Sequence, residues 1–314
     1  MMRYFLIIFL LICDLLFENA VKAQSPKIFD AVKNNDLKEL KSLFQQGADP
    51  NSYDDDSDHV LMNAALYSSL DVMQLLLEKG SDPNAKNKAG ETALMWAVHD
   101  AAKIKLLIQH GADVNAKAKS GNTPLLIACI GHGKYDIIKL LLDHGSDALA
   151  TNQKKENALM RAALFGDTTT ISLLLSKGID INARDKDSLT ALINSIFNVN
   201  RSVTIQLLDR GADPDLISAF GLSAVSASVT YNDTESIMAI LKKAKNINTW
   251  DYDGHTALMW AVYNEHDNVA IIQALLDKGA DVNIKAKDGA TALSWALKKG
   301  NTATVSVLKK VGAK

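Results

Sequence analysis

Residues 253–283 read DGHTALMWAVYNEHDNVAIIQALLDKGADVN and contain one complete copy of the unit from which the chain is built. The segment opens on a turn at Asp253-Gly254 and continues through two apolar stretches. It closes on Gly279-Ala280-Asp281-Val282-Asn283. A glycine directly after an apolar helix fits a left-handed C-cap, which glycine adopts without strain. The stretch therefore predicts a turn, two short helices and an exit loop.

The closing pentad of this segment recurs along the chain at a nearly constant interval. Its first position falls at Gly47, Gly80, Gly111, Gly145, Gly178, Gly211, Ala244, Gly279 and Gly312. The successive intervals are 33, 31, 34, 33, 33, 33, 35 and 33 residues. A fixed period of this length indicates stacked supersecondary units, each burying its apolar face against its neighbours.

The units resemble ankyrin repeats over nearly all of the chain after about residue 26. Thr123-Pro124-Leu125 matches the start of the family's first helix, and Gly131-His132 matches its Gly-His between the helices. The resemblance implies an all-α solenoid of nine stacked helix-turn-helix units with hairpin-like turns. It also implies a concave face, made of turn tips and first helices, that binds proteins. The repeats are expected to end near residues 51, 84, 115, 149, 182, 215, 248, 283 and 314.

Several positions depart from the repeat pattern and test how strictly it holds. Ala244 replaces the C-cap glycine, so we expect strain or looseness there. Leu149 replaces the asparagine of the fourth exit loop, while Lys155 and Ser188 replace turn glycines. These changes put the local loop geometry in doubt, but not the fold.

The terminal units and the uneven intervals give further expectations. Residues 25–51 form an N-terminal cap with a polar outer face, and lysines near the C-terminus do the same for the last unit. The 31-residue interval predicts a shortened loop between helices near residues 100–103. The 35-residue interval predicts a lengthened one near residues 265–268.

Residues 1–23 are predicted to be a secretory signal peptide. Arg3 gives a positive start, an apolar run follows, and Val21-Lys22-Ala23 supplies small residues at a cleavage site. The apolar run is shorter than the roughly 20 residues of a membrane-spanning helix. Leu10-Leu11-Ile12-Cys13 loosely resembles a bacterial lipoprotein box, although Ile12 is bulky for that position. We therefore expect residues 24–314 to form the mature repeat domain.

Composition excludes several classes of function. The formal net charge of −2 gives no whole-chain electrostatic reason to bind nucleic acid or an anionic membrane. The hydrophobic content of 47% is ordinary for a soluble chain with a continuous core. Removal of the signal would leave Cys129 as the only cysteine, expected to be a small buried hydrophobic residue.

The sequence carries no recognisable catalytic, cofactor or metal site. The acidic run at residues 54–58 partly matches a calcium loop, but no glycine occupies position 59 and Ala65 stands where the glutamate ligand belongs. The seven histidines lack zinc-ligand spacing. Carboxylate pairs such as Asp185 with Asp187 and Asp251 with Asp253 recur at the repeat period and read as turn formers. We expect neither an enzyme nor a cofactor.

A tryptophan row falls at one position of three repeats, at Trp96, Trp260 and Trp295. The row could be a stacking platform for a partner. Because the position is apolar in most copies, we interpret it instead as core between adjacent first helices.

Large aromatic side chains at turn tips and at the ends of first helices are not needed to hold a repeat together. Clustered exposed aromatic residues mark recognition surfaces, although each ring can instead pack on its own neighbours. Exposed lysines on earlier turn tips would add a basic region. The candidate partner-binding residues are Tyr67, Phe165, Phe197, Phe220, Tyr231, Trp250, Tyr252, Tyr263, Lys88 and Lys119.

The sequence therefore predicts a monomeric, non-enzymatic protein–protein interaction scaffold without cofactor in an exported compartment, the periplasm if the chain is bacterial. Two alternatives remain open. The chain could be a secreted effector that binds a host protein, or an accessory subunit that supports an envelope enzyme. The identity of the partner does not follow from a repeat scaffold, because such folds bind unrelated targets.

Overall fold

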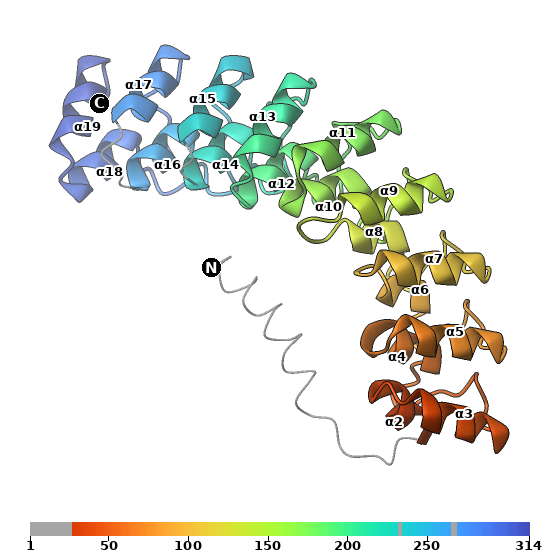
Figure 1. Cartoon of the computed structure of the whole chain (residues 1–314). Helices are drawn as coiled ribbons and strands as arrows, with labels where there is room; N and C mark the ends of the chain where they lie inside the picture. Colours follow the sequence, from red (N-terminus) through yellow and green to blue (C-terminus); the bar gives the residue numbers. More distant parts are fainter. Residues whose placement is uncertain (1–26, 232–233, 265–268) are drawn as a thin grey trace. The chain divides into compact units, whose positions relative to one another are not determined.

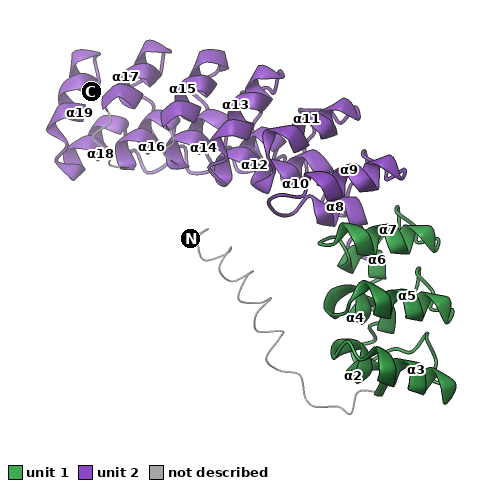
Figure 2. Ribbon diagram, viewed as in Figure 1, with its two compact units in different colours: residues 1–118 green, residues 119–314 purple. Residues whose placement is uncertain are grey.

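The computed structural model describes residues 27–231, 234–264 and 269–314. The predicted signal peptide, its lipoprotein-box alternative, the start of the N-terminal cap and the predicted long loop at residues 265–268 lie outside the described residues. The chain divides into two compact units, residues 1–118 and 119–314 (Figure 2). Both units are built from the same helix pair, and the described residues contain isolated β-bridges but no named strand.

Unit 1 contains three helix pairs. They are α2 (Lys27–Lys33) with α3 (Leu37–Gln45), α4 (Val60–Tyr67) with α5 (Leu70–Glu78), and α6 (Ala93–Trp96) with α7 (Ala101–Gln109). First helices pack on first helices, as α2 on α4 and α4 on α6, and second helices on second helices, as α3 on α5 and α5 on α7. The predicted shortening of the loop near residues 100–103 is wrong: α6 is reduced to one turn, four residues separate it from α7, and residues 101–103 lie within α7.

Unit 2 contains six helix pairs, and Figure 1 shows its first and second helices as two parallel rows. The first helices are α8 (Pro124–Ala128), α10 (Ala158–Phe165), α12 (Ala191–Phe197), α14 (Ala224–Tyr231), α16 (Ala257–Tyr263) and α18 (Ala292–Lys299). The second helices are α9 (Tyr135–Asp143), α11 (Thr168–Ser176), α13 (Arg201–Asp209), α15 (Thr234–Lys243), α17 (Val269–Asp277) and α19 (Thr302–Lys310). Within the described residues, the prediction of an all-α fold of stacked ankyrin-like helix pairs is confirmed, with three pairs in unit 1 and six in unit 2.

The two rows differ in burial because they have different neighbours. All residues from Ala191 to Ile196 of α12 are buried, since this helix packs against α10, α13 and α14. In α13 only Val203, Thr204, Leu207 and Leu208 are buried, which leaves one face of the helix exposed. Burying apolar surface stabilises by about 25 cal/mol per Å², so the stack depends chiefly on the first helices. The core includes Cys129, as predicted.

First helices start at a side-chain cap in most repeats. Thr123 Oγ1 accepts the N–H of Leu126 at 3.2 Å, and Thr256 Oγ1 accepts the N–H of Met259 at 3.4 Å. Such caps satisfy one of the N–H groups that a helix leaves without an intrahelical partner. In the second repeat the cap is His59, whose Nδ1 accepts the N–H of Leu61 at 3.3 Å.

The asparagine of the exit loop connects neighbouring repeats. Asn248 Nδ2 donates to the Gly279 carbonyl at 3.1 Å, and its Oδ1 accepts the N–H of Asp281 at 2.8 Å. Asn84 makes the same two bonds to Gly111 and Asp113, at 2.9 and 2.7 Å. We call this pair of bonds the asparagine clamp. The asparagine of one repeat thus holds the exit loop of the next repeat.

Polar side chains also bind carbonyl groups at the end of the preceding repeat's first helix. The buried ammonium group of Lys103 donates to the Ala65 carbonyl at 2.9 Å, and Asn264 Nδ2 donates to the Val229 carbonyl at 3.1 Å. Burial lowers the pKa of Lys103, while Asp100 acts in the opposite direction. These bonds satisfy carbonyl groups at helix C-termini, which lack partners within the helix.

The departures from the repeat pattern at Lys155, Ser188 and Ala244 have two different structural outcomes. Lys155 and Ser188 keep the turn, with φ values of 60° and 59°, so these side chains occupy the left-handed region that glycine has elsewhere. The expected strain at Ala244 is wrong, because this residue does not have a positive φ. The chain instead leaves α15 with the N–H groups of Lys245 and Asn246 bonded to the Asp215 carboxylate at 3.0–3.1 Å.

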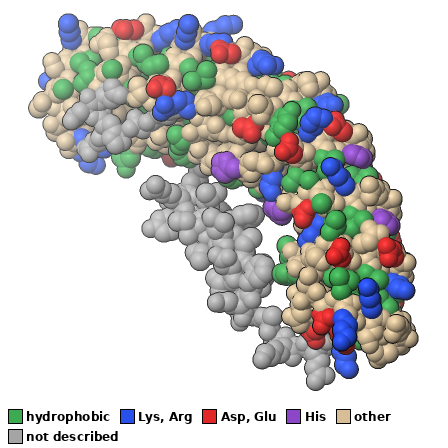
Figure 3. Space-filling model, viewed as in Figure 1, with side chains coloured by type: hydrophobic (Ala, Val, Ile, Leu, Met, Phe, Trp, Pro, Cys, Tyr) green, Lys and Arg blue, Asp and Glu red, His purple; other side chains and the backbone are tan. Residues whose placement is uncertain are grey.

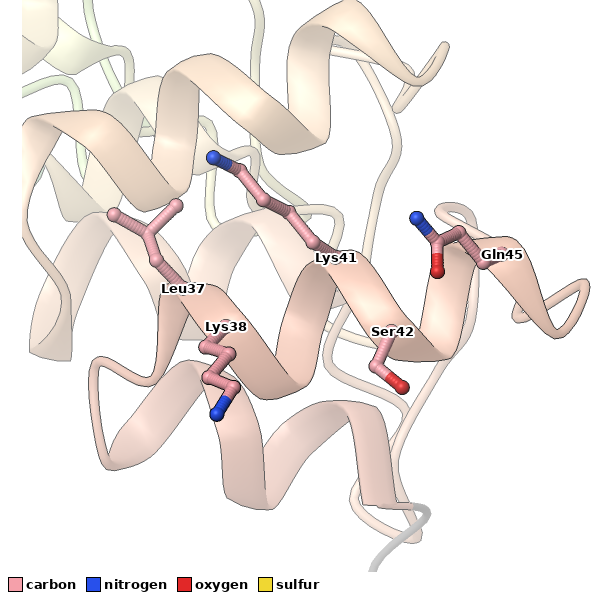
Figure 4. A pocket seen from close by; sticks show the side chains of 5 residues that line it. All are labelled: Leu37, Lys38, Lys41, Ser42 and Gln45. Atoms are coloured by element: carbon pink, nitrogen blue, oxygen red, sulfur yellow. The ribbon is translucent and has the colours of Figure 1, made fainter.

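The described part of the N-terminal cap has the expected polar outer side. Figure 4 shows the five side chains that line an open hollow on α3. Lys38, Lys41 and Gln45 are exposed, while Leu40 and Leu43 face the core. None of the helices in the described ranges is long and apolar enough to span a bilayer.

Candidate protein-binding surface

The turn tips of unit 2 are joined by backbone hydrogen bonds. The N–H of Gln153 donates to the Ser120 carbonyl at 2.9 Å, and the N–H of Lys186 to the Lys154 carbonyl at 2.9 Å. Ala219 and Lys287 donate in the same way to the previous tip, at 2.8 and 2.9 Å. Side chains on these four bonded pairs of tips are therefore held at fixed spacing on one side of unit 2. We call the side formed by these tips and the first helices the tip face.

Two aromatic tips approach each other closely. Gly221 has a φ of +78°, and a Cβ atom at this position would lie 2.6 Å from the Trp250 carbonyl oxygen and 2.8 Å from Asp251 Cα. Only glycine allows this approach, which sets Phe220 on one tip beside Trp250 on the next. The exposed fractions are 53% for Phe220, 63% for Trp250 and 76% for Tyr252. Large apolar side chains thus face solvent on adjoining tips.

Rings from α16 and α18 form a cluster next to these tips. The Trp295 ring centroid lies 5.4 Å from that of Tyr263, 6.0 Å from Trp260 and 4.9 Å from His255. Trp260 also contacts Tyr263 edge-on at 5.6 Å. Edge-on and tilted pairs at these separations are favourable arrangements of aromatic rings. Asp251, which lies between Trp250 and Tyr252, accepts a hydrogen bond from Trp260 and so connects the tip to the cluster. We group these residues as the C-terminal aromatic surface: Phe220, Trp250, Tyr252, Trp260, Tyr263 and Trp295.

Asp251 fixes this surface to its turn. Its Oδ2 accepts the indole N–H of Trp260 at 3.0 Å, and its Oδ1 accepts the backbone N–H groups of Asp253 and His255 at 3.0 and 2.9 Å. His255 Nδ1 lies 3.4 Å from the same Oδ2, too poorly oriented for a hydrogen bond. The carboxylate is therefore a turn former that also orients an indole ring.

Lysines border the aromatic surface. Lys299 Nζ lies 4.4 Å from the Tyr263 ring centroid and donates to the Tyr263 carbonyl, while Lys287 Nζ lies 4.3 Å from the Tyr252 ring centroid. Ammonium groups over aromatic faces are attracted by the ring quadrupole. Tyr263, Trp295, Lys298 and Lys299 line an open hollow of about 370 Å³. The border of the surface thus carries positive charge.

The structure separates the remaining predicted residues into smaller groups. Phe197 and Tyr231 form a pair with ring centroids 5.6 Å apart, and both are half-buried. Burial raises the pKa of the Tyr231 hydroxyl. Phe165 is also half-buried, and its ring packs edge-on against His132 at 5.8 Å. These three rings therefore pack on repeat neighbours and offer less free surface than the tips.

Three predicted residues lie apart from the aromatic surface. Tyr67, 47% exposed at the end of α4, and the exposed Lys88 belong to unit 1. Lys119 is exposed beside the first tip of unit 2. Nothing in the described contacts connects them to the aromatic cluster.

The interpretation of the tryptophan row as core is wrong. Trp96, Trp260 and Trp295 are half-buried, and the latter two form the centre of the aromatic cluster. The recurrence of tryptophan at one position of two successive repeats was the available signal, because equivalent positions of neighbouring repeats lie side by side. Trp96 is different: its indole N–H donates to Glu91 at 3.0 Å.

The acidic turns make ordinary structural contacts. Asp185 Oδ1 accepts the N–H groups of Asp187 and Leu189, at 2.9 and 2.8 Å, as expected of a turn former. Asp58 accepts the amide of Asn87 at 2.8 Å, and burial raises the pKa of Asp58. Among the residues that the structure describes, no three potential metal ligands come together.

Stacked helix pairs with hairpin-like turns and a Gly-Ala-Asp-x-Asn exit loop define the chain as a helical repeat protein. The family model for ankyrin repeats (three copies) matches residues 28–118, 99–185 and 192–286. The chain belongs to the ankyrin repeat family, and the resemblance inferred from its motifs is confirmed.

Similar curated proteins share only part of their length with this chain. An L-asparaginase of Dirofilaria immitis is 29% identical over 42% of this chain and 22% of its own length. A mitochondrial disaggregase of Bos taurus is 35% identical over 34% of this chain and 16% of its own length. A putative ankyrin repeat-containing protein of Treponema pallidum is 32% identical over 34% of this chain and 37% of its own length. The chain thus spans between about a sixth and two fifths of these relatives.

Proposed function

We propose that this chain is a non-enzymatic scaffold that binds a protein partner on the tip face of unit 2. The observation that carries the proposal is the C-terminal aromatic surface, where Trp250 and Tyr252 are 63% and 76% exposed on tips held by backbone bonds. Such rings bury much area with little loss of side-chain entropy, and they dominate binding energy at interfaces. Membership of the ankyrin repeat family supports a protein as the partner class.

The scaffold presents its surface without a large rearrangement. Tip-to-tip hydrogen bonds and asparagine clamps fix neighbouring repeats, so little conformational entropy is lost when a partner docks. No reactive group is required of the chain in this mechanism. The surface offers the partner a fixed shape, exposed aromatic rings and the positive charge of the bordering lysines.

A triple variant tests the proposal. Phe220→Ala/Trp250→Ala/Tyr252→Ala should reduce recovery of the partner in a cross-linking pull-down by at least about tenfold, because aromatic truncations at a binding centre cost several kcal/mol together. Circular dichroism should show unchanged helix content, since all three side chains are exposed. Met238→Ala/Val311→Ala removes two exposed apolar side chains from the second-helix side and should leave recovery unchanged. Undiminished recovery with the triple variant would refute the aromatic surface as the docking site.

We further propose that the scaffold works outside the cytoplasm. The support is the charge and hydropathy layout of residues 1–23. N-terminal sequencing of the mature chain should begin at Gln24, and a chain that retains Met1 in the cytosol would contradict the proposal. Recovery from the periplasm would favour an accessory subunit of an envelope enzyme. Recovery from the medium or from a host cell would favour a secreted effector.

A further inference from the structure

The charge of the last repeat differs sharply from that of the whole chain. Residues 284–314 contain seven lysines and one aspartate, a formal charge of +6, whereas the chain as a whole carries −2. In Figure 3, Lys and Arg side chains, with some Asp and Glu among them, appear along the edge formed by the second helices α15, α17 and α19. The C-terminal aromatic surface therefore ends in a strongly basic repeat.

The hollow on α16 and α18 combines this charge with aromatic area. Its lining consists of the Tyr263 and Trp295 rings, with centroids 5.4 Å apart, together with Lys298 and Lys299 from the last turn of α18. Its volume of about 370 Å³ lies within the usual range of sites that hold a compact organic group. Lys299 is engaged with the ring and the carbonyl of Tyr263, whereas Lys298 is exposed.

Charge complementarity decides what the hollow can accept. A cationic group would be repelled by both ammonium groups and would find the Tyr263 ring already facing Lys299. The nearby Asp251 carboxylate accepts bonds from Trp260 and from its own turn, so it offers little compensation. A carboxylate next to an apolar side chain complements both the lysines and the rings of the lining.

We infer that this hollow binds an acidic peptide segment of the partner, in which a large apolar side chain lies against Tyr263 and Trp295 while a neighbouring Asp or Glu pairs with Lys298. The inference rests on the proposed scaffold function and specifies its partner chemistry. The apolar side chain supplies the buried area, and the carboxylate supplies orientation and a faster encounter with the basic repeat.

A display library of random dodecapeptides, selected on the full chain, tests this inference. Selected sequences should be enriched in Asp or Glu within two positions of Phe, Trp, Leu or Ile. The same selection on the Lys298→Glu chain should lose this acidic enrichment. Lys309→Glu changes the net charge equally in the same repeat, but on α19, and should leave the selected sequences acidic.

The best selected peptide is then titrated against purified variants by fluorescence anisotropy. Trp295→Ala and Lys298→Glu should each weaken binding by about tenfold or more, as expected at a binding centre, while Trp96→Ala and Lys309→Glu change it less than about twofold. Because Trp295→Ala can loosen the last repeat, Lys298→Glu at an exposed site provides the test that does not depend on folding.

Three results would overturn the inference. The first is selection of peptides without acidic residues, and the second is a peptide affinity that Lys298→Glu leaves unchanged. The third is displacement of the peptide by a single-stranded RNA oligonucleotide or by phosphatidylserine vesicles as effectively as by unlabelled peptide, which would show a general polyanion surface. Neutral peptides that still require Trp295 would refute the acidic chemistry while leaving the scaffold function intact. A chain that selects no peptide at the hollow, yet loses its partner in the Phe220/Trp250/Tyr252 variant, would likewise refute only the hollow.

Discussion

His59 makes the stability of unit 1 depend on pH. Its side chain is 1% exposed, and burial lowers its pKa from 6.5 to about 4, although Asp82 and Asp49 act in the opposite direction. Below pH 6.5 the unfolded chain takes up a proton on His59 that the folded chain does not. The free energy of unfolding therefore falls as the pH drops from 6.5 to about 4.

The His59→Thr substitution should remove this acid sensitivity. Threonine is the side-chain cap at the equivalent Thr123, Thr190 and Thr256, so it fits the fold. The gap between the two pKa values corresponds to ~3 kcal/mol of stability lost by wild type across this range. Urea denaturation at several pH values should show the variant losing less stability than wild type by an amount of that order. His144→Gln, at an exposed site, is the control and should retain the wild-type slope; parallel slopes for wild type and His59→Thr would contradict the assignment.

Ser188 occupies a turn position that favours glycine. Its φ of 59° places a Cβ atom in the left-handed region, at a cost of about 1–2 kcal/mol relative to glycine. Ser188→Gly should raise the free energy of unfolding by about 0.5–1 kcal/mol, since glycine also loses more backbone entropy on folding. Chemical denaturation of wild type and variant measures this difference in the free energy of unfolding. Ser188→Ala keeps the strain and should give no gain, and a gain of the same size for both variants would exclude backbone strain as the cause.

The thiol of Cys129 is expected to react very slowly in the folded chain. The thiol is 1% exposed, and burial raises its pKa to about 12, with only a weak opposing effect from Arg161. Because the thiolate is the reactive species, a Cys13→Ser chain should react with a disulfide reagent at least about a hundredfold more slowly when folded than in guanidinium chloride. Rapid labelling under native conditions would show that the repeat around α8 opens easily.

At the scale of the repeat, the exit loop of the fourth repeat carries a residue that cannot form the asparagine clamp. Leu149 stands at the clamp position of the fourth repeat, is 59% exposed and cannot bond to the Gly178 carbonyl or the Asp180 N–H. Its apolar side chain contributes little burial in compensation. The boundary between the fourth and fifth repeats therefore lacks the two hydrogen bonds that Asn51, Asn84, Asn248 and Asn283 make at their boundaries.

Leu149→Asn should restore this clamp. Two new inter-repeat hydrogen bonds are worth about 1–2 kcal/mol together. Thermal unfolding should show a higher midpoint, and hydrogen exchange should slow at the Asp180 amide. Leu149→Ser also removes the exposed apolar side chain, but the serine side chain is too short to make both hydrogen bonds of the clamp. If serine stabilised the chain as much as asparagine, the clamp would not be the cause.

The repeat units could be predicted from the sequence because their physics is local and periodic. The glycine interval, the threonine caps and the apolar spacing of the helices each recur, so errors at one copy are corrected by the others. The prediction of strain at Ala244 was wrong because hydrogen bonds from the backbone of Lys245 and Asn246 to Asp215 replace the glycine cap. These bonds connect two repeats. The clamp was missed for the same reason: its bonds connect residues about 30 positions apart.

The candidate surface could be predicted only in part. Exposure of Phe220, Trp250 and Tyr252 followed from their place on turn tips, where nothing covers them. The role of Trp260 and Trp295 could not be predicted in this way, because the half-burial of their rings depends on how adjacent first helices are spaced. Burial of Phe165, Phe197 and Tyr231 likewise depends on neighbours in adjoining repeats, which a single repeat sequence does not specify.

At the scale of the whole chain, the stability of each helix pair should come from its neighbours. A peptide of residues 191–223, which covers α12, α13 and the following turn, exposes the faces that contact α10 and α14 in the stack. Circular dichroism of this peptide should show little helix, since short helices are marginal in water without packing. A stably folded isolated pair would contradict the nearest-neighbour account.

Site-specific photo-crosslinking in the native cell tests most directly whether the tip face of unit 2 is where this scaffold meets its partner. A photoreactive phenylalanine analogue is placed at Tyr252 on the tip face, which is 76% exposed, and, as the control, at Met238 on α15, which is 49% exposed. The account predicts a discrete cross-linked protein from position 252 and none from position 238. Cross-links from position 238 alone, or the same products from both positions, would contradict it.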